Sequence, residues 1–316
     1  MDGCFVMFDV IIVGGGAAGL TAAIYTCRKA LKTLVVSPEY GGQTNLTAHI
    51  ENYPGFIAST GWDLMAKFKE HAEHFGAETR TSKVTNVEKK GKGFLVHFDD
   101  GSKEECRAVI LCHGKLPRPL NIPGEKEFLG RGLSTCATCD APLYKGKDVA
   151  VIGGGNAALE AVEELQHVGA NVTLVHRRTE FRADEITVKK VKALKGVTFI
   201  LNHSPVAIKG EKYVTAFEIE DVNTKKHQTL KLDGVFSEIG HVADSSMVKE
   251  LCKLNPAGEV IVDEAGNTSC PGIFAAGDIT PVRYKQTVIA AGEGAKAALE
   301  CHRWLIGGKI TGEYSK

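Results

Sequence analysis

The sequence predicts an α/β fold made of two three-layer domains, the second inserted into the first. One observation is length, because 316 residues suit two domains of about 150 residues each. The other is a weak internal repeat: residues 10–19 and 149–158 each carry an apolar run, three successive glycines and a run of small residues. A strand, a glycine turn and a helix in this order are typical of Rossmann-like nucleotide-binding units. We therefore expect one such unit in each domain.

Each repeat continues in the order that such a unit requires. Helices are expected at 20–30 and 159–168, and second strands at 33–36 and 171–175. A further strand at 108–112 leads into the proline-rich segment 115–123, which we interpret as a linker.

A second crossing between the domains is expected near 240–246. The residues after it predict strands and a glycine turn within 258–262 and 272–279, followed by a helix over 288–305. This C-terminal stretch is too short to bury a core of its own, so it should complete the first domain. The predicted first domain comprises 1–114 and 247–316, and the second comprises 115–246.

Composition and charge are those of an ordinary globular protein. Hydrophobic residues make up 43% and charged residues 24%, and 38 basic side chains balance 38 acidic ones. A net charge of zero provides no broad attraction to nucleic acid or to an anionic membrane. The apolar run from Val10 is cut by glycines and lacks a basic leader, so we do not interpret it as a signal peptide.

The first glycine motif consists of Gly14, Gly16 and Gly19. Glycines at this spacing allow a tight turn and close backbone approach, and the N-terminus of the next helix favours a pyrophosphate. The alternative is a strand-to-helix turn without a ligand. The position 23 residues after Gly14, where a carboxylate usually holds a ribose hydroxyl, is Ser37, and Glu39 follows two residues later as a possible substitute.

The second glycine motif gives a sharper indication of its ligand. It contains Gly153, Gly155 and Ala158. The same count of 23 leads to a basic cluster made of His176, Arg177, Arg178 and Arg182. Guanidinium groups at the end of the second strand pair with the 2′-phosphate of an adenosine ribose, which a carboxylate would repel, so NADPH is favoured over NADH. The alternative is a solvated basic stretch.

Nine cysteines, an odd number, lie mostly in apolar segments. This pattern is typical of free thiols in a reducing compartment, and we therefore expect a cytosolic protein. One pair differs by its spacing, because Cys136 and Cys139 form a C-x-x-C at the predicted start of a short helix, where a thiol pKa is lowered. A zinc site is disfavoured, since Cys106 and Cys112 are too widely spaced to supply a second close pair.

Asp140 follows the pair directly. If burial raises its pKa, its carboxyl could supply or accept the proton that thiol–disulfide exchange moves. An ordinary helix-capping aspartate would have the same sequence, and the residues alone do not separate the two interpretations.

Taken together, these motifs resemble those of the low-molecular-weight thioredoxin reductases over essentially the whole chain. The segments that carry the resemblance are the two glycine motifs, Gly41-Gly42-Gln43, Glu51-Asn52-Tyr53-Pro54-Gly55, Cys136-Ala137-Thr138-Cys139-Asp140, His176-Arg177-Arg178 with Arg182-Ala183, and Gly272-Ile273-Phe274-Ala275-Ala276-Gly277-Asp278.

The resemblance implies FAD in the first domain and NADPH in the second. It implies FAD contacts from Gly14, Gly16, Gly19, Gln43, Asn52, Gly277, Asp278, Lys285 and Gln286. It also implies that Cys139 faces the flavin, that Cys136 attacks the disulfide of thioredoxin and that Asp140 is the acid. Electrons then pass from NADPH through FAD and the cysteine pair to thioredoxin, in a homodimer whose second domain rotates on its linkers.

Several residues depart from the family pattern without removing a group that this chemistry requires. They are Cys112-His113-Gly114, Thr135, Ala141, Ala243-Asp244-Ser245 and Lys285, the last standing where arginine is usual. Two alternatives remain. One is a reductase of the same fold with another electron donor, ferredoxin or reduced flavin, or with another protein target. The other is a nucleotide sensor that uses the cysteines as a switch.

Overall fold

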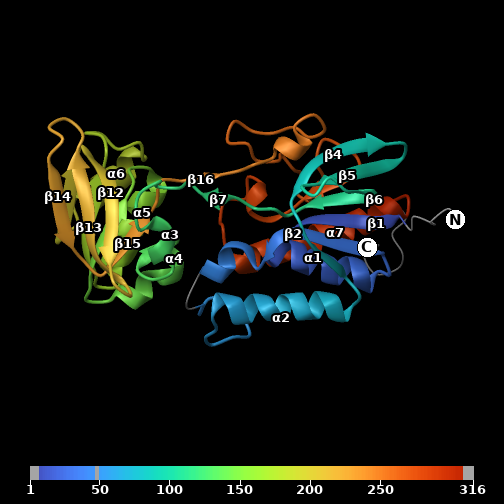
Figure 1. Cartoon of the computed structure of the whole chain (residues 1–316), viewed down its shortest axis with the longest axis horizontal. Helices are drawn as coiled ribbons and strands as arrows, with labels where there is room; N and C mark the ends of the chain where they lie inside the picture. The colour runs from blue at the N-terminus through green and yellow to red at the C-terminus, as the bar shows by residue number, and fades with distance from the viewer. Residues whose placement is uncertain (1–6, 47–49, 309–316) are drawn as a thin grey trace. The chain divides into compact units, whose positions relative to one another are not determined.

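The computed structural model describes residues 7–46 and 50–308, which contribute to two compact units (Figure 1). Unit 1 is built from the described residues up to Asn45, from Glu51–Leu116 and from Val242 onward, and unit 2 is built on Pro117–His241. The chain therefore leaves unit 1 once, forms unit 2 and returns, which is the arrangement of an inserted domain.

Unit 1 contains a seven-stranded sheet in the order β3-β2-β1-β6-β5-β4, with β17 also paired to β6. Its strands are β1 (Phe8–Gly15), β2 (Thr33–Tyr40), β3 (Glu78–Thr81), β4 (Val84–Lys90), β5 (Gly93–Phe98), β6 (Lys103–Leu111) and β17 (Ile273–Ala275). Strand β6 has two partners along its length, because its first residues pair with β5 in antiparallel fashion and its last residues pair with β17 in parallel fashion.

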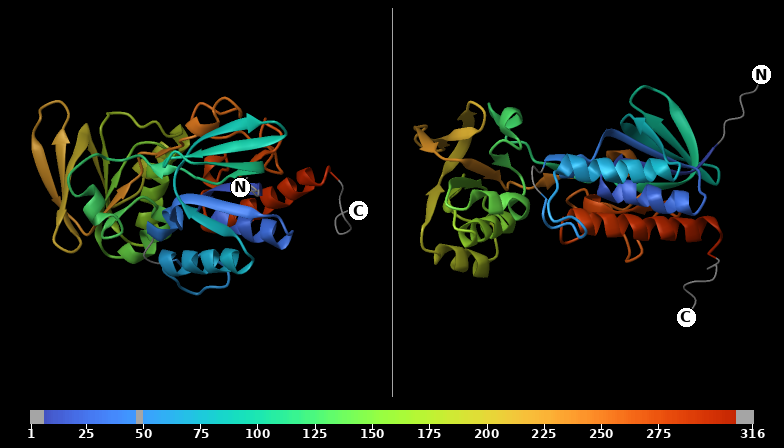
Figure 2. Two further views of the ribbon diagram at one scale, coloured as in Figure 1. Left: turned by 45° about the vertical axis from the view of Figure 1, so that its right-hand side comes forward. Right: turned by 90° about the horizontal axis from the view of Figure 1, so that it is seen from below.

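Three helices cover one face of this sheet: α1 (Ala17–Arg28), α2 (Gly61–His74) and α7 (Thr287–Leu305). Helix α1 lies between α2 and α7 (Figure 2). A Cβ on Gly294 of α7 would overlap the carbonyl oxygen of Ala18, so α1 and α7 cross with their backbones in contact. Unit 1 also has three short 3-10 helices, η1 (Gly42–Leu46), η3 (Ser246–Val248) and η4 (Gly277–Ile279).

Alternation along β1 builds two cores, one on each face of the sheet. Val10 and Ile12 pack toward the helices, whereas Ile11 and Val13 pack toward the β4–β5 hairpin and the segment around η3. All four side chains are almost fully buried, as expected for a central parallel strand covered on both faces.

Unit 2 has a five-stranded parallel sheet in the order β11-β10-β9-β15-β8 and a three-stranded antiparallel sheet in the order β12-β13-β14. The parallel strands are β8 (Leu133–Ser134), β9 (Asp148–Ile152), β10 (Asn171–His176), β11 (Val197–Leu201) and β15 (Gly234–Ser237). The antiparallel strands are β12 (His203–Gly210), β13 (Val214–Asp221) and β14 (His227–Lys231).

Helices cover one face of the parallel sheet of unit 2, and the antiparallel sheet covers the other. The helices are α3 (Glu125–Phe128), α4 (Ala137–Asp140), α5 (Asn156–His167), α6 (Glu185–Lys192) and the 3-10 helix η2 (Ala141–Tyr144). Along β9, Val149 and Val151 pack toward α5, while Ala150 and Ile152 pack toward Phe217 of β13. The expected three-layer α/β architecture is thus confirmed.

The two crossings between the units pair with each other as a two-stranded sheet, β7 (Leu116–Pro117) and β16 (His241–Val242). Arg118 N–H also donates to the Gly240 carbonyl at 2.8 Å. No helix within the part of the chain that the structure describes is both long and apolar enough to cross a lipid bilayer.

Two expectations about elements need correction. Helices α1 and α5 begin three residues before the predicted starts, because Gly16 and Gly155, with extended backbones, are themselves the N-caps. The strand expected at 258–262 does not form beyond one bridge between Leu254 and Val260. There, the side-chain oxygen of Asn255 accepts bonds from the backbone N–H groups of residues 257 and 259, which closes a tight turn.

Candidate functional site

The glycines of unit 1 divide into two kinds. A Cβ on Gly14 would overlap the carbonyl of Cys112, and a Cβ on Gly19 would overlap the carbonyl of Gly14, so these two allow the packing of strand on helix. A Cβ on Gly16 would have only one neighbour, the Gly41 carbonyl oxygen at 4.0 Å. Because the first turn of α1 has no acidic residue and no side-chain cap, this open space fits a pyrophosphate.

The end of β2 places a carboxylate near this turn of the chain. Ser37 is buried and its hydroxyl donates to the Glu39 carbonyl, while the Glu39 side chain is exposed. Tyr40 packs against Gly15, and its own hydroxyl donates to Val35 and Arg80 carbonyls. Ser37 therefore has a structural partner, and Glu39 is the acidic group left accessible at this strand end.

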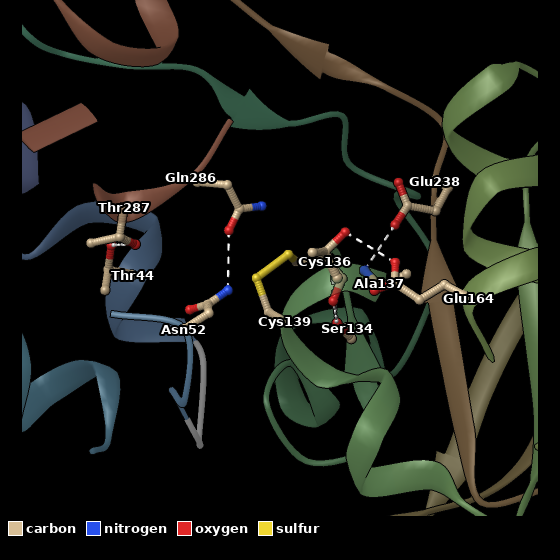
Figure 3. Close-up of a disulfide and its surroundings, with 11 residues drawn as sticks. Thr44, Asn52, Ser134, Cys136, Ala137, Cys139, Glu164, Glu238, Gln286 and Thr287 are labelled. Carbon is tan, nitrogen blue, oxygen red and sulfur yellow. Dashed lines mark hydrogen bonds between the residues drawn. A yellow bond between two sulfur atoms is a disulfide. The ribbon is translucent and has the colours of Figure 1, made fainter. Parts of the chain in front are cut away.

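The polar residues that the resemblance assigned to the flavin are linked in part by hydrogen bonds within unit 1. Asn52 Nδ2 donates to Gln286 Oε1 at 3.2 Å (Figure 3), and Gln43 Nε2 donates to the Lys115 carbonyl. Gln286 is the N-cap of α7, so its backbone lies at the start of a 19-residue helix. Gly277 N–H is held by Glu293 Oε2 at 2.9 Å.

Lys285 and Asp278 belong to a buried charged group in unit 1. Lys285 Nζ donates to the carbonyls of Asp278 at 3.3 Å and Thr280 at 2.8 Å, and it lies 3.7 Å from Glu259 Oε1. Lys115 also pairs with Glu259. Burial raises the pKa of Asp278, which Lys285 and Lys115 oppose, and burial lowers the pKa of Lys285. Two lysines and one glutamate leave this group ready to accept further negative or polar ligand atoms.

The second glycine turn repeats the division seen in the first. A Cβ on Gly153 would lie 2.5 Å from the Glu238 carbonyl oxygen and 2.6 Å from Ala158 Cβ, so both small residues allow close packing. Gly155 has no heavy atom within 4 Å of its Cβ position, and the first turn of α5 carries no acidic residue. Here again an open helix N-terminus fits a phosphate group.

His176 lies beneath this turn rather than among the exposed cations. Its ring occupies the space that a Cβ on Gly154 would need, stacks on Phe181 and contacts the Glu180 carbonyl through Nε2 at 3.1 Å. Burial, helped by the charges of the neighbouring arginines, lowers its pKa. A neutral His176 shapes the turn but adds no positive charge.

The arginines of the basic cluster are exposed: Arg177, Arg178 and Arg182. None of the three forms an ion pair with a described residue. Arg182 N–H donates to the Gly154 carbonyl at 2.7 Å, which returns the loop after β10 to the glycine turn. Three unpaired guanidinium groups therefore stand at the strand end that the residue count identified.

Cys136 and Cys139 form a disulfide with a Cα–Cα distance of 5.3 Å. Cys136 is the N-cap of α4, the short helix expected from the sequence, and its N–H donates to the Ser134 hydroxyl at 3.1 Å. Both cysteines are accessible at least in part, whereas most of the other described thiols are buried. The pair is thus the described sulfur chemistry that an external partner can reach.

Asp140 has the surroundings of a proton carrier. Its Oδ1 is buried without a hydrogen-bond partner, and its side chain caps no helix. Burial raises the pKa of Asp140, with a smaller opposing effect from the Ser134 hydroxyl. These contacts favour the acid interpretation over the capping interpretation.

One residue beside the disulfide was missed by sequence reasoning. Glu238 follows β15, and its Oε1 accepts a bond from Ala137 N–H at 3.3 Å (Figure 3). Burial raises the pKa of Glu238 to about 7, with further contributions from Glu164 and Glu160. The available signal was an acidic residue directly after a buried apolar strand, but no motif contains it.

The comparisons with known proteins agree with this site. Residues 8–294 match the family model described as pyridine nucleotide-disulphide oxidoreductase. The chain is 43% identical over 300 residues to the bifunctional thioredoxin reductase/thioredoxin of Mycobacterium leprae (strain TN), covering 94% of this chain and 66% of that protein. It is 39% identical over 300 residues to the alkyl hydroperoxide reductase F protein of Staphylococcus aureus (strain MRSA252), covering 95% and 59%.

A solved structure extends the likeness to three dimensions. The thioredoxin reductase from Streptococcus pyogenes MGAS5005 superposes with a TM-score of 0.89 at 35% identity, covering 96% of this chain and 99% of that one. The chain spans about two thirds or less of the length of the curated relatives described above. These matches confirm the resemblance drawn from the motifs.

Proposed function

The chain belongs to the pyridine nucleotide-disulphide oxidoreductase family, and on that premise we propose that it is an FAD-dependent thioredoxin-disulfide reductase that uses NADPH. Family membership implies use of a flavin and a pyridine nucleotide. The observation that carries the more specific proposal lies in unit 2, where the accessible Cys136–Cys139 disulfide shares one unit with a glycine turn flanked by unpaired arginines.

We assign FAD to unit 1 and NADPH to unit 2. The open position at Gly16 would receive the FAD pyrophosphate, with Glu39 placed for a ribose hydroxyl. Gln43, Asn52 and Gln286 would orient the ring system, while Asp278 and the lysines of the charged group would hold polar atoms of the cofactor. When bound, the flavin takes a hydride from the nicotinamide and gives two electrons to a disulfide.

In unit 2, the open position at Gly155 would receive the NADPH pyrophosphate. Arg177, Arg178 and Arg182 would neutralise the 2′-phosphate, since charge-assisted hydrogen bonds from guanidinium groups are strong and bidentate. His176 would act indirectly, by filling the space under Gly154 and fixing the shape of the turn.

The cysteine pair and Asp140 would exchange electrons and a proton with the protein substrate. After reduction, the Cys136 thiolate attacks the substrate disulfide and forms a mixed disulfide. Cys139 then attacks that bond, which releases the reduced substrate thiol and regenerates the intramolecular disulfide. Asp140, protonated more readily because of burial, would donate the proton that the departing thiolate needs.

The test is to add NADPH or NADH to the purified yellow protein and then to supply thioredoxins from the same cell. The proposal expects NADPH to bleach the flavin far faster than NADH, followed by thioredoxin-dependent reduction of insulin. Failure of NADPH to bleach the flavin would remove it as the donor. Bleaching without reduction of any thioredoxin would remove thioredoxin as the substrate.

A second protein substrate is favoured by the 39% identity to the alkyl hydroperoxide reductase F protein. The same disulfide would then serve a different partner dithiol, with unchanged NADPH and FAD chemistry. Coupled assays that contain peroxide, a peroxiredoxin and no thioredoxin distinguish the two. NADPH consumption under those conditions identifies the second substrate.

We further propose a cytosolic homodimer. The described thiols outside the redox pair, namely Cys27, Cys106, Cys112, Cys252, Cys270 and Cys301, are unpaired, which suits a reducing compartment. The homodimer follows from the resemblance. Sedimentation velocity of the FAD-loaded protein tests it, and a single species at the monomer mass would refute it.

A further inference from the structure

Glu238 stands between the two functional motifs of unit 2. Its backbone N–H donates to the Ile152 carbonyl at 2.8 Å, and its own carbonyl lies against Gly153. These contacts fix the backbone of Glu238 at the carboxyl end of the parallel sheet, beside the glycine turn. The side chain extends from this fixed point to Ala137, the residue that follows Cys136.

The environment of the Glu238 carboxyl is acidic. From α5, Glu160 and Glu164 face it and disfavour its ionisation, and Glu164 Oε2 also accepts from the Thr138 hydroxyl at 3.0 Å. From α4 it meets the Ala137 N–H and the adjacent cysteines, with Asp140 at the end of that helix. Within the described ranges no basic side chain forms an ion pair with Glu238. Negative charge on this carboxyl is therefore not neutralised by a neighbour.

We propose that Glu238 is a positioning residue for the Cys136–Cys139 pair, which holds the Ala137 amide between the cysteines and sets how readily the disulfide is reduced. An ionised carboxylate hydrogen-bonded to the residue after Cys136 repels the negative charge of a nearby thiolate. A protonated carboxyl keeps the hydrogen bond to Ala137 but removes that repulsion. Reduction is then coupled to the protonation of Glu238.

Electrons and protons balance in this step. Two electrons from a dithiol, or from reduced flavin in the proposed cycle, break the S–S bond. Two protons complete the thiols, or one proton leaves a thiol and a thiolate. In the second case the remaining negative charge favours uptake of the other proton by Glu238. The two electrons and two protons are thus accounted for in either distribution.

This coupling should depend on pH. The pKa of Glu238 is raised to about 7, so the carboxyl is largely neutral below that value and becomes charged above it. Repulsion of the thiolate therefore appears as pH rises from about 6 to about 8. It should make the disulfide harder to reduce and raise the pKa of the Cys136 thiol at the upper end of this range.

The experiment is a glutathione redox titration of the FAD-loaded protein at about pH 6 and about pH 8, on either side of the Glu238 pKa, with alkylation and peptide mass spectrometry reporting Cys136 and Cys139 alone. Glu238→Gln keeps an oxygen acceptor for Ala137 N–H and removes the charge. At the higher pH it should shift the equilibrium toward the dithiol about tenfold, or about 30 mV for a two-electron couple. At the lower pH the shift should be less than about twofold.

Two further variants separate charge from structure. Glu238→Ala also lacks the charge, makes no steric demand and should reproduce the shift at the higher pH. Glu160→Gln removes one carboxylate from the exposed face of α5 and should change the equilibrium by less than about twofold. An equal shift at both pH values in Glu238→Gln would indicate a structural effect only, and no shift at the higher pH would overturn the proposal.

The inference rests on the proposed function only in that the pair must be reduced during turnover. The titration requires neither NADPH nor thioredoxin. A protein that reduces no thioredoxin can therefore still show the pH-dependent shift, and an active reductase can still lack it.

Discussion

The imidazole of His176 fills the space that a side chain on Gly154 would occupy, whereas the next residue, Gly155, has nothing within 4 Å of its Cβ position. Adjacent glycines thus serve different purposes. Gly154 lets a buried ring support the turn from below, and Gly155 leaves room above it for a ligand.

This difference predicts opposite phenotypes for two alanine substitutions. Gly154→Ala should displace His176 and lower the free energy of unfolding by about 1–3 kcal/mol through overpacking. Gly155→Ala should change that free energy by less than about 1 kcal/mol, yet weaken NADPH binding at least about tenfold, because its Cβ enters the proposed pyrophosphate position. Thermal unfolding and calorimetric titration measure the two effects. Equal loss of stability in both variants would contradict the assignment.

The exposed arginines should determine coenzyme preference. Removing the guanidinium group in Arg177→Ala or Arg178→Ala should raise the KM for NADPH about tenfold or more, since hydrogen bonds to charged groups contribute about 1.5–3 kcal/mol. The KM for NADH should hardly change. Arg131→Ala, which removes another exposed arginine of unit 2, is the matched control. If NADH and NADPH weaken together, the cluster does not contact the 2′-phosphate.

The two sulfur atoms should differ in their reaction with thioredoxin. Cys139→Ser leaves Cys136 to attack, so it should accumulate a stable mixed disulfide with a thioredoxin that lacks its resolving cysteine, when both are mixed after oxidation of that thioredoxin by a small disulfide. Cys136→Ser should not. Non-reducing electrophoresis shows the adduct, and an adduct on Cys139 alone would reverse the assigned roles.

Asp140→Asn should slow thioredoxin reduction by about 100-fold or more, because an amide does not donate the proton in exchange. Burial raises the pKa of Asp140, so the wild-type rate should fall as pH rises through that raised value and the carboxyl loses its proton. The Asn variant should lack this limb of the pH profile. Stopped-flow oxidation of the reduced enzyme by thioredoxin measures both, and an unchanged profile would assign the limb to another group.

His113 should make stability sensitive to acid. Both of its ring nitrogens are buried without a partner, and burial lowers its pKa to about 4, which Asp244 partly opposes. Because the unfolded chain binds a proton at about pH 6.5, stability is complete above that pH and is lost as pH falls toward about 4.

His113→Thr should remove this dependence. Relative to wild type, the variant should gain stability as pH falls from about 6.5 to about 4, by about 3 kcal/mol at most. Melting temperatures across this range provide the measurement, with the exposed His74→Gln as control. Parallel pH profiles for wild type and His113→Thr would show that another group titrates.

Much of the fold could be predicted because it is encoded by short-range patterns. The glycine repeats, the apolar strands and the C-x-x-C each lie within a few residues, and their physical requirements are local. The helix starts were predicted late because Gly16 and Gly155 cap their helices without a side-chain signal.

The rest depends on contacts between distant segments. Glu238 lies 101 residues from Ala137 in sequence, and Lys115 lies 144 residues from Glu259. His176 carried the expected register of a phosphate ligand, yet tertiary packing places it below the turn. Register along one strand does not report which face a neighbouring loop will cover.

The pairing of β7 with β16 means that the chain enters and leaves unit 2 at a single hydrogen-bonded gateway. Unit 1 completes its sheet with β17, and its helical layer with α7, only after that gateway has closed. A neighbouring pair of ends is the arrangement that allows a whole domain to be exchanged as a cassette. Lineages could thus recombine the disulfide-bearing module while keeping the host core intact.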